Sequence, residues 1–269
     1  MTDQAEMKLA LLKGARLSDL PKGMQFEEIT GCWCGGQLES WSLDFEPYVQ
    51  CAECGCKCVR FQATRRSLEE FYSEHYWYDY QTAHGCPAVQ ERYETDMLDR
   101  IPAYLNWIGR TGTPPARILE VGCGNGRLLH ELALRGYDCE ASEMDPDIAA
   151  WVTNKTGIAV YPGAFPPADS QPYDLILLID VLEHVRDPIQ FVEEVRRRLS
   201  PAGRVLLHCP VIDSIEAAAR LKYLFNPISH LWMHTTHSME RLWTRAGMQP
   251  EKIGELFGMP GLVIRARAS

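Results

Sequence analysis

One short stretch of this chain, RILEVGCGNGRLL, restricts the fold more than any other. An apolar strand at 117–121 runs directly into three alternating glycines, Gly122, Gly124 and Gly126, and then into a helical stretch. Glycines at such a turn let the backbone fold tightly and let a ligand approach without a Cβ in the way. In a doubly wound sheet, this first turn lies at the topological switch point, where ligands bind. The stretch therefore predicts a sheet of this kind with a ligand site at the turn.

The sequence of this turn excludes the two common phosphate-binding motifs, the dinucleotide-binding turn and the P-loop. A dinucleotide-binding turn has the form G-x-G-x-x-G, but Arg127 stands where its last glycine would be. The sequence also contains no G-x-x-x-x-G-K-[ST] run. The turn therefore fits a ligand that carries no phosphate.

Short apolar strands alternate with helical stretches from Arg117 to the end of the chain. Alternation of this kind predicts an α/β fold with a mostly parallel sheet covered by helices on both faces. Predicted strands occupy 117–121, 138–143, 158–161, 173–179, 205–209, 250–257 and 262–267. Predicted helices occupy 126–135, 146–155, 187–199 and 238–246. We therefore expect a doubly wound, Rossmann-like sheet of seven strands.

An acidic residue closes the strand that follows the glycine turn. Glu143 lies 21 residues after Gly122, where the acid of a nucleotide-binding βαβ unit accepts both hydroxyls of a ribose. From Arg117 onward, the chain resembles class I S-adenosylmethionine (SAM)-dependent methyltransferases. The stretch EVGCGNG is similar to the first motif of that family. The stretch YDLILLIDVLEHVRDPIQFVEEVRRRLSPAGRVLLHCP, at 173–210, is similar to its fourth strand, the following helix and its fifth strand.

The resemblance implies a cofactor site with defined roles. The glycines would pack against the methionine and ribose of SAM, Glu120 would support their loop through hydrogen bonds, and Glu143 would hold the ribose. Met144 and Phe165 would lie by the adenine, although both could equally be core residues. The full implied set is Glu120, Gly122, Cys123, Gly124, Gly126, Glu143, Met144, Ala164, Phe165, Ile179 and Asp180.

Six of the ten cysteines fall within 27 residues, which is typical of a metal site in a reducing compartment. The knuckle Cys51-x-x-Cys54-Gly55 lets two thiolates reach one tetrahedral zinc ion, and Cys32-x-Cys34 is the partner pair. We expect the metal ligands to be Cys32, Cys34, Cys51 and Cys54, with Cys56 or Cys58 as replacements for one member. Four protein ligands leave no open position, so the zinc would be structural. The cysteine module resembles the N-terminal zinc ribbon of a bacterial subgroup of these methyltransferases.

Histidine is the usual base near neutral pH, and two groups of histidines qualify for this role. His184 follows the predicted strand at 173–179 and could act as a base or support the SAM pocket. His230, His234 and His237 are spaced i, i+4 and i+7, which predicts one shared helical face. That face could form an acceptor pocket, a second metal site or plain solvent contacts. We expect His184, His234 and His237 to be the catalytic histidines.

An aromatic run at 71–80 follows an S-x-x-E capping box at 67–70. The capping box predicts a helix that begins at Ser67 and continues into the run. The aromatic side chains could form a lid over SAM or pack between the cysteine module and the larger domain. We expect three segments in the chain: a zinc-binding module at 1–62, a helical linker or lid at 63–115, and a methyltransferase domain at 116–269.

Charge and hydropathy argue against nucleic acid as a general partner and against a membrane-spanning segment. The formal net charge of −9 argues against a general nucleic-acid binder, which needs clustered Lys and Arg. The longest apolar strand-like run, Leu175–Ile179, is five residues, far short of the ~20 that span a bilayer. Asp3 and Glu6 stand where an export signal would be basic and then apolar. We expect a cytoplasmic protein without a transmembrane segment.

The expected function is methyl transfer from SAM, as cosubstrate, to a small-molecule, sugar or lipid-linked acceptor. The reaction would leave S-adenosylhomocysteine (SAH), and Zn²⁺ would be a structural ion. Two alternatives stay open. One is an RNA base methyltransferase that binds RNA through the cysteine module. The sequence argues against it, because IDVLEH occupies the position where such enzymes have an Asn/Asp-Pro-Pro-Tyr/Phe motif. The other is a non-catalytic module that binds SAM and holds a partner.

Overall fold

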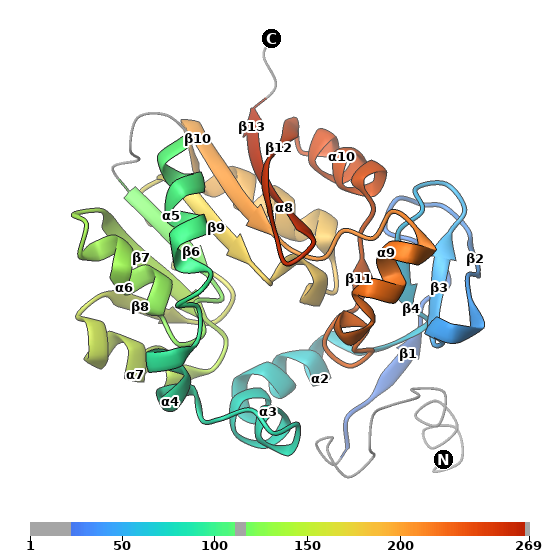
Figure 1. Cartoon of the computed structure of the whole chain (residues 1–269), viewed down its shortest axis with the longest axis horizontal. Coiled ribbons are helices and arrows are strands. Elements are labelled where there is room, and N and C mark those ends of the chain that lie inside the picture. Colours follow the sequence, from blue (N-terminus) through green and yellow to red (C-terminus); the bar gives the residue numbers. More distant parts are fainter. Residues whose placement is uncertain (1–22, 111–116, 267–269) are drawn as a thin grey trace.

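A computed structural model describes residues 23–110 and 117–266 of the chain. A seven-stranded sheet forms its centre, with the strand order β12–β13–β10–β9–β6–β7–β8 (Figure 1). Strand β13 runs in the opposite direction to the other six strands of this sheet, which all share one direction. The bounds are β6 (Arg117–Val121), β7 (Asp138–Glu143), β8 (Ala159–Pro162), β9 (Tyr173–Ile179), β10 (Leu199–His208), β12 (Met248–Leu256) and β13 (Met259–Ala266). The predicted seven-stranded, mostly parallel sheet is confirmed.

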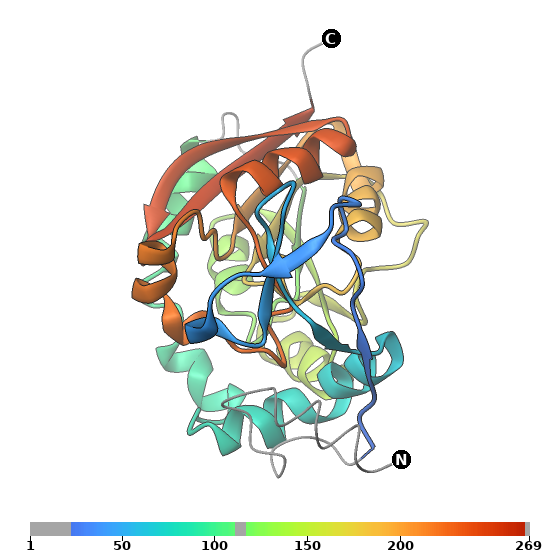
Figure 2. The ribbon, with the colours of Figure 1, turned by 90° about the vertical axis from the view of Figure 1, so that its right-hand side faces the viewer.

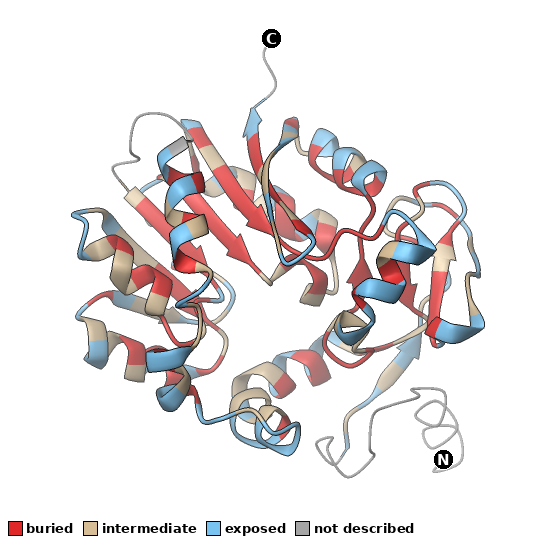
Figure 3. Cartoon of the chain, viewed as in Figure 1, coloured by how far each residue is buried: buried red, intermediate tan, exposed pale blue. Residues whose placement is uncertain are grey.

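Helices cover both faces of this sheet, as expected for a doubly wound fold. One face packs against α5 (Ile101–Arg110) and α6 (Arg127–Ala133), and α6 in turn packs against α7 (Pro146–Thr156). The other face packs against α8 (Pro188–Arg198) and α10 (Thr236–Arg245). The central strands are buried along most of their length, while the outer sides of the helices are exposed (Figure 3). The sheet is therefore a rigid platform whose strand ends can position a site.

The cysteine-rich segment forms a second, four-stranded sheet with the order β11–β4–β3–β2. Its strands are β2 (Leu38–Ser40), β3 (Tyr48–Cys51), β4 (Lys57–Val59) and β11 (Trp232–Met233). Strand β11 comes from the C-terminal half of the chain and pairs with β4, with Trp232 opposite Cys58. Figure 1 labels β11 beside β4, and the side of the molecule that carries this sheet faces the viewer in Figure 2. The module therefore shares one core with residues from the larger domain.

Short elements connect the two sheets. Strand β1 (Phe26–Glu28) pairs with β5 (Phe61–Ala63), and α2 (Arg65–Glu70) continues into a wide-turn helical segment, η3 (Phe71–Tyr80). The remaining elements are η2 (Leu43–Phe45), α3 (Gln81–Ala83), α4 (Val89–Thr95), η4 (Leu182–His184), α9 (Ile215–Arg220) and η5 (Lys222–Leu224). No helix of the described segments is long and apolar enough to cross a membrane.

The structure corrects one predicted helix start. Helix α2 begins after Thr64, whose side chain accepts a hydrogen bond from the backbone N–H of Ser67. Ser67 is therefore inside the first turn, and its own hydroxyl accepts from the backbone N–H of Gln25, 2.9 Å away. The prediction of a start at Ser67 was wrong because this hydroxyl serves a contact with the N-terminal segment rather than a cap.

Candidate functional site

The carboxyl ends of β6, β7 and β9 open into a cavity of about 1040 Å³. Its walls also include parts of α2, η3, η4 and the loop between α4 and α5. Ten of the eleven residues expected to bind cofactor line it: Glu120, Gly122, Cys123, Gly124, Glu143, Met144, Ala164, Phe165, Ile179 and Asp180. Gly126 is the exception. The cavity therefore joins the glycine turn to side chains from distant parts of the chain.

The glycine loop is held in place by backbone hydrogen bonds to the next strand. The N–H groups of Gly122 and Cys123 both donate to the carbonyl oxygen of Ser142, at 2.8 and 3.1 Å. Gly122 and Gly124 have φ values of +64° and +54°, a region that strongly favours glycine. The loop can therefore present backbone atoms to a ligand at close range.

Gly126 has a packing role in this loop rather than a place on the cavity wall. It precedes α6 with φ +70°, and a Cβ added there would lie 2.4 Å from Cγ1 of Val152 on α7. The expected contact of Gly126 with SAM is therefore not supported by the geometry. The residue is needed because helix α7 approaches the loop closely.

Glu143 ends β7 with a buried carboxylate that faces the glycine loop. Its Oε2 accepts from the N–H of Gly124 at 2.9 Å, and its Oε1 accepts from the N–H of Asp145 at 3.3 Å and the indole N–H of Trp77 at 3.4 Å. Burial raises the pKa of Glu143, while the bonds from Gly124 and Asp145 lower it. A carboxylate fixed in this way can accept hydrogen bonds from a diol in the cavity.

Trp77 covers the glycine loop from the side of η3. A Cβ added to Gly124 would lie 3.2 Å from the Trp77 ring, and the guanidinium of Arg92 lies 5.2 Å from the centre of that ring. Tyr72 and Tyr76 line the cavity beside Trp77. Two other members of the aromatic run, Phe71 and Tyr80, are buried in the core shared with the cysteine module. The run therefore both lines the cavity and joins the two parts of the chain.

Asp180 directly follows β9 and has a positive φ of +53°. Its Oδ2 accepts from Nη1 of Arg100 at 3.0 Å, and its Oδ1 lies 3.8 Å from Nδ1 of the buried His208. The Tyr104 hydroxyl contacts the same Nδ1 at 3.0 Å. The sequence alone does not reveal Arg100, Tyr104 and His208 as neighbours of Asp180, because they lie far from it along the chain and no motif marks them.

Glu120, in β6 just before the glycine loop, is buried, and its side chain was expected to support that loop through hydrogen bonds. Burial, together with the nearby charge of Glu143, raises its pKa to about 8. Its Oε2 has no hydrogen-bond partner within the described residues. Glu120 therefore lines the cavity and carries one buried oxygen without a partner among the described residues.

His184 and His230 meet at the cavity wall. Nδ1 of His184 lies 2.7 Å from the carbonyl oxygen of Ser229 and 2.9 Å from the Tyr72 hydroxyl. The rings of His184 and His230 have centroids 4.7 Å apart. Burial, and then the charge of His230, lower the pKa of His184 to about 3, so its imidazole is neutral near neutral pH. A neutral ring with so low a pKa is a weak base.

The prediction of a single helical face for the histidines at 230–237 was wrong. His230 lies in a loop, His234 directly follows β11, and of the three only His237 lies on α10. The segment is not one helix because Trp232 and Met233 form β11, which pairs with β4 of the module sheet. His234 is fully buried, with Nδ1 3.8 Å from Sγ of Cys56. His237 is exposed. Neither lines the cavity, so the geometry does not support the expected catalytic role of His234 or His237.

Four of the clustered cysteines converge within the module. The Sγ atoms of Cys32, Cys34, Cys51 and Cys54 all lie within 4.8 Å of one another. A Cβ added to Gly36 would lie 2.5 Å from Sγ of Cys51. The close contact between this sulfur and the backbone therefore leaves no room for a side chain at position 36. This is the set expected from the sequence to bind metal.

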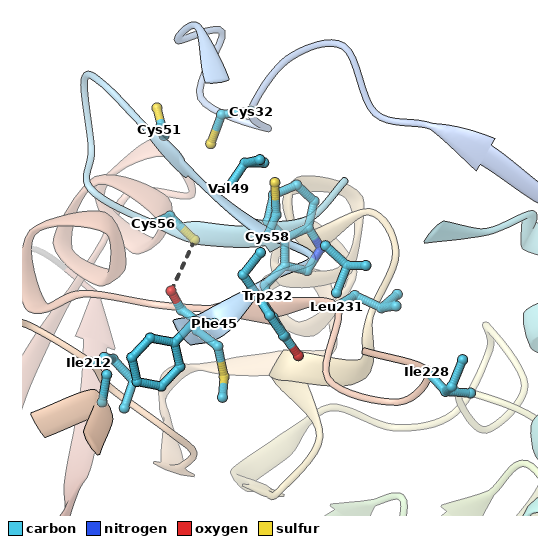
Figure 4. Close-up of a cluster of buried hydrophobic side chains, with 14 of the residues drawn as sticks. Cys32, Phe45, Val49, Cys51, Cys56, Cys58, Ile212, Ile228, Leu231 and Trp232 are labelled. Carbon is cyan, nitrogen blue, oxygen red and sulfur yellow. Dashed lines mark hydrogen bonds between the residues drawn. The ribbon is translucent and has the colours of Figure 1, made fainter. Parts of the chain in front are cut away.

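Cys56 and Cys58 point instead into the shared core. The dashed line in Figure 4 joins Sγ of Cys56 to the carbonyl oxygen of Met233, 3.5 Å away. The figure also shows Cys58 among Val49, Leu231 and Trp232. Cys58 therefore packs as a small apolar group, whereas the thiol of Cys56 contacts polar atoms of the β11 segment.

The sheet order, the glycine loop and the acid at the end of β7 together define the class I SAM-dependent methyltransferase fold. A family model described as "Methyltransferase domain" matches residues 89–253, which is more than half of the chain. The chain belongs to this methyltransferase family. The expectation that the chain is a class I SAM-dependent methyltransferase is confirmed for its fold and its family.

Sequence relatives include two ubiquinone biosynthesis O-methyltransferases. The one from Caulobacter sp. (strain K31) is 30% identical over 110 residues, covering 37% of this chain and 42% of the relative. The one from Pseudomonas aeruginosa (strain UCBPP-PA14) is 30% identical over 120 residues, covering 41% of this chain and 52% of the relative. This chain thus spans about half the length of the curated relatives that it matches.

Solved structures share the fold at low sequence identity. Magnesium protoporphyrin IX methyltransferase from Synechocystis PCC 6803, with bound SAH, has a TM-score of 0.56 and 14% identity, covering 76% of this chain and 100% of that chain. An O-methyltransferase family protein from Burkholderia thailandensis has a TM-score of 0.55 and 12% identity, covering 73% of this chain and 63% of that chain. At such identities the likeness describes the fold alone.

Proposed function

We propose that this protein transfers the methyl group of SAM to a hydroxyl group of a small-molecule acceptor. Three observations support the proposal: the methyltransferase family, the cavity that contains both Glu143 and His184, and sequence relatives that are named O-methyltransferases. A small metabolite, a sugar or a lipid-linked intermediate with a free hydroxyl belongs to this acceptor class.

In the proposed complex, the cofactor lies across the carboxyl ends of β6, β7 and β9. Glu143 accepts hydrogen bonds from the ribose hydroxyls, and Gly122 and Gly124 allow the sugar and the methionine to lie against the backbone. Met144, Ala164 and Phe165 flank the adenine. Ile179, Asp180 and Glu120 surround the methionine end.

Methyl transfer is an in-line displacement that depends mainly on alignment. A lone pair of the acceptor oxygen forms the new C–O bond while the C–S bond breaks, and the bonding electrons return to sulfur to give neutral SAH. The hydroxyl proton is released to solvent. The protein contributes by fixing the two reactants at a short distance and by excluding water from the methyl group.

The acceptor would occupy the part of the cavity that lies beyond the glycine loop. Three aromatic residues and two histidines line the cavity: Tyr72, Tyr223, Phe257, His184 and His230. Aromatic rings with a few polar groups suit a largely apolar ligand that is oriented by one or two hydrogen bonds. His184 is the one expected catalytic histidine that lines the cavity.

The observation that carries the proposal is the buried Glu143 carboxylate, held by the glycine loop at the cavity wall. Isothermal titration with SAH tests it on wild type, Glu143→Ala and the exposed control Glu240→Ala. Loss of hydrogen bonds to a charged group should weaken binding by about tenfold or more in Glu143→Ala and leave the control unchanged. Wild-type protein without affinity for SAH would overturn the proposal. Fractionated extract metabolites, added with SAM, should then yield SAH and a methylated product.

We also propose that Cys32, Cys34, Cys51 and Cys54 hold a structural zinc ion. A tetrahedral ion with bonds of about 2.3 Å to sulfur separates its ligands by about 3.8 Å. Two sulfur pairs are close to that spacing: Cys32 and Cys54 at 3.7 Å, and Cys34 and Cys51 at 3.5 Å. Four thiolates leave no position for a substrate, so the ion would stabilise the module.

We infer that the chain has three segments with different roles. Residues 1–62 would supply the zinc module, 63–115 the lid that carries Trp77, and 116–269 the cofactor domain. Residues 1–22, 111–116 and 267–269 of these segments lie outside the described residues. Because β11 joins the module sheet, zinc binding would also support the loop that carries His230.

A further inference from the structure

The loop at 224–231 runs from the end of η5 to β11 and forms part of the wall of the main cavity. Leu224 and His230 of this loop line the cavity, and the rings of His230 and His184 lie beside each other there. By sequence the loop belongs to the larger domain. Much of its support nevertheless comes from the cysteine module, near the other end of the chain.

Aromatic side chains of the module pack around Phe225, at the start of this loop. Between ring centroids, Phe225 lies 4.7 Å from Phe45 and 5.0 Å from Tyr48. Trp41 stacks on both Phe45, at 4.9 Å, and Phe225, at 5.8 Å. Aromatic pairs at such distances are stabilised beyond the burial of their apolar area. The module therefore fixes the start of the loop.

Hydrogen bonds from the module fix the other end of the loop. The Tyr48 hydroxyl donates to the carbonyl oxygen of His230 at 2.7 Å. The carbonyl oxygen of Leu231 accepts from the backbone N–H of Val59 at 3.1 Å and from the side-chain amide of Gln62 at 3.4 Å. Two consecutive peptide groups of the loop are thus held by β3, β4 and β5.

The loop in turn orients both histidines at the cavity wall. Nδ1 of His184 lies 2.7 Å from the carbonyl oxygen of Ser229, and Nδ1 of His230 lies 2.5 Å from that of Leu224. A carbonyl oxygen only accepts hydrogen bonds, so each Nδ1 carries the proton and donates. Burial lowers the pKa of both rings, so both are neutral near neutral pH and each keeps a lone pair on Nε2. A shift of the loop would therefore move two polar groups that an acceptor can meet.

Tyr48 is the module residue that contacts both ends of the loop. Its ring packs edge-on against Phe225, and its hydroxyl bonds to the backbone of His230. The side chain is buried, and burial raises the pKa of Tyr48 well above its usual value, so the hydroxyl stays protonated and donates. Tyr48 is not among the residues that line the cavity. Any effect that it has on a ligand must therefore pass through the loop.

We propose that Tyr48 is a positioning residue for methyl transfer, which holds the 224–231 loop so that His230 and His184 face the acceptor. The cysteine module is then part of the acceptor site, in addition to any stability that it gives the chain. The inference rests on the proposed methyl transfer in this cavity. It separates the two substrates, because Glu143 and the glycine loop receive no contact from Tyr48 among the described residues.

Tyr48→Phe tests the proposal, because it keeps the ring against Phe225 and removes only the hydroxyl. Isotope-edited NMR of the histidine side chains in the zinc-loaded, full-length protein gives the direct readout, with His230→Ala to assign the signals. Tyr48→Phe should shift the His230 resonances and speed exchange of its Nδ1 proton with water by about three- to tenfold. Tyr173→Phe is the matched control, since the buried Tyr173 hydroxyl donates over the same 2.7 Å to Glu140 in the central sheet. It should leave the His230 resonances unchanged.

Initial rates provide the second readout, with SAM and the extract fraction that yields a methylated product. Tyr48→Phe should raise the KM for the acceptor by about two- to tenfold and leave the KM for SAM, the SAH affinity and the zinc content as in wild type. Tyr173→Phe should leave the KM for the acceptor unchanged.

The proposal is overturned if Tyr48→Phe leaves the His230 resonances as in wild type, or changes them without a change in the KM for the acceptor. Equal effects of Tyr48→Phe and Tyr173→Phe would also overturn it, since they would reflect a general loss of stability. If Tyr48→Phe is unfolded, Phe225→Leu tests the same contact from the side of the loop with the same readouts. Wild-type protein without SAH affinity would instead contradict the proposed function, and the histidine resonances would still report whether Tyr48 holds the loop.

Discussion

The indole N–H of Trp77 donates to the carboxylate of Glu143 at 3.4 Å, although the two residues come from different parts of the chain. The same indole ring lies against Gly124, whose N–H donates to the other oxygen of Glu143. One aromatic side chain therefore contacts both elements of the proposed ribose site. The segment η3, which carries it, also enters the core of the cysteine module through Phe71 and Tyr80.

Trp77 should therefore contribute to cofactor binding. Trp77→Phe removes one hydrogen-bond donor and should weaken SAH binding by about two- to tenfold, and Trp77→Ala should weaken it further because the ring is lost. Titration calorimetry measures the effect, and Tyr78→Phe at an exposed neighbouring ring is the control. Wild-type SAH affinity in both Trp77 variants would show that the ring only fills space.

Gly126 should be required for stability at this corner of the sheet. Gly126→Ala places a Cβ 2.4 Å from Val152 at a φ of +70°, so overpacking of about 1–3 kcal/mol adds to backbone strain of about 1–2 kcal/mol. Gly136→Ala is a matched control, since its φ is +86° and nothing lies within 4 Å of the added Cβ. Urea unfolding of both variants isolates the packing effect. Equal losses in free energy of unfolding would contradict the assigned contact with Val152.

The sheet could be predicted because its signals are local. Apolar runs bounded by turn residues mark each strand, and the predicted bounds of β6, β7 and β9 match those in the structure. Strand β10 begins at Leu199 rather than 205, because Leu199 pairs with Tyr173 before an irregular stretch that includes Pro201 and Gly203. Such a stretch resembles a loop when only the sequence is considered.

The candidate site could be predicted only where its residues follow a strand directly. The glycine loop, Glu143 and His184 meet that condition. His230 approaches His184 through a loop, and β11 pairs with a strand near the other end of the chain. The i, i+4, i+7 spacing suggested a helix, but pairing with β4 outweighed that local pattern. Contacts between such distant segments depend on tertiary packing, which a single sequence does not reveal.

Loss of the zinc site should destabilise the whole chain rather than the module alone. Cys54→Ser should lower both zinc content and thermal stability, because Thr235 of the larger domain donates to the carbonyl of Cys54 at 2.9 Å and the core is shared. Cys86→Ser, outside the cluster, is the control. Elemental analysis and calorimetry check both points. A zinc-free wild-type protein with an unchanged melting temperature would refute a structural ion.

Glu120 should make the protein less stable as the pH rises. Burial raises its pKa from 4.5 to about 8 in the folded state. A raised pKa means that the folded state holds the proton more tightly than the unfolded chain. The stabilisation is therefore complete below about pH 4.5 and is lost as the pH rises through about 8.

Glu120→Gln keeps the shape of the side chain and removes its titration, so the variant should lose less stability over this interval than wild type. The difference between the two proteins should change by more than about 1 kcal/mol between about pH 5 and about pH 8, in the direction that favours the variant at high pH. Urea unfolding at several pH values measures it, with the exposed Glu240→Gln as control. Parallel stability curves for wild type and Glu120→Gln would show that the carboxyl group already titrates at its ordinary pKa, and that solvent reaches it at the base of the glycine loop.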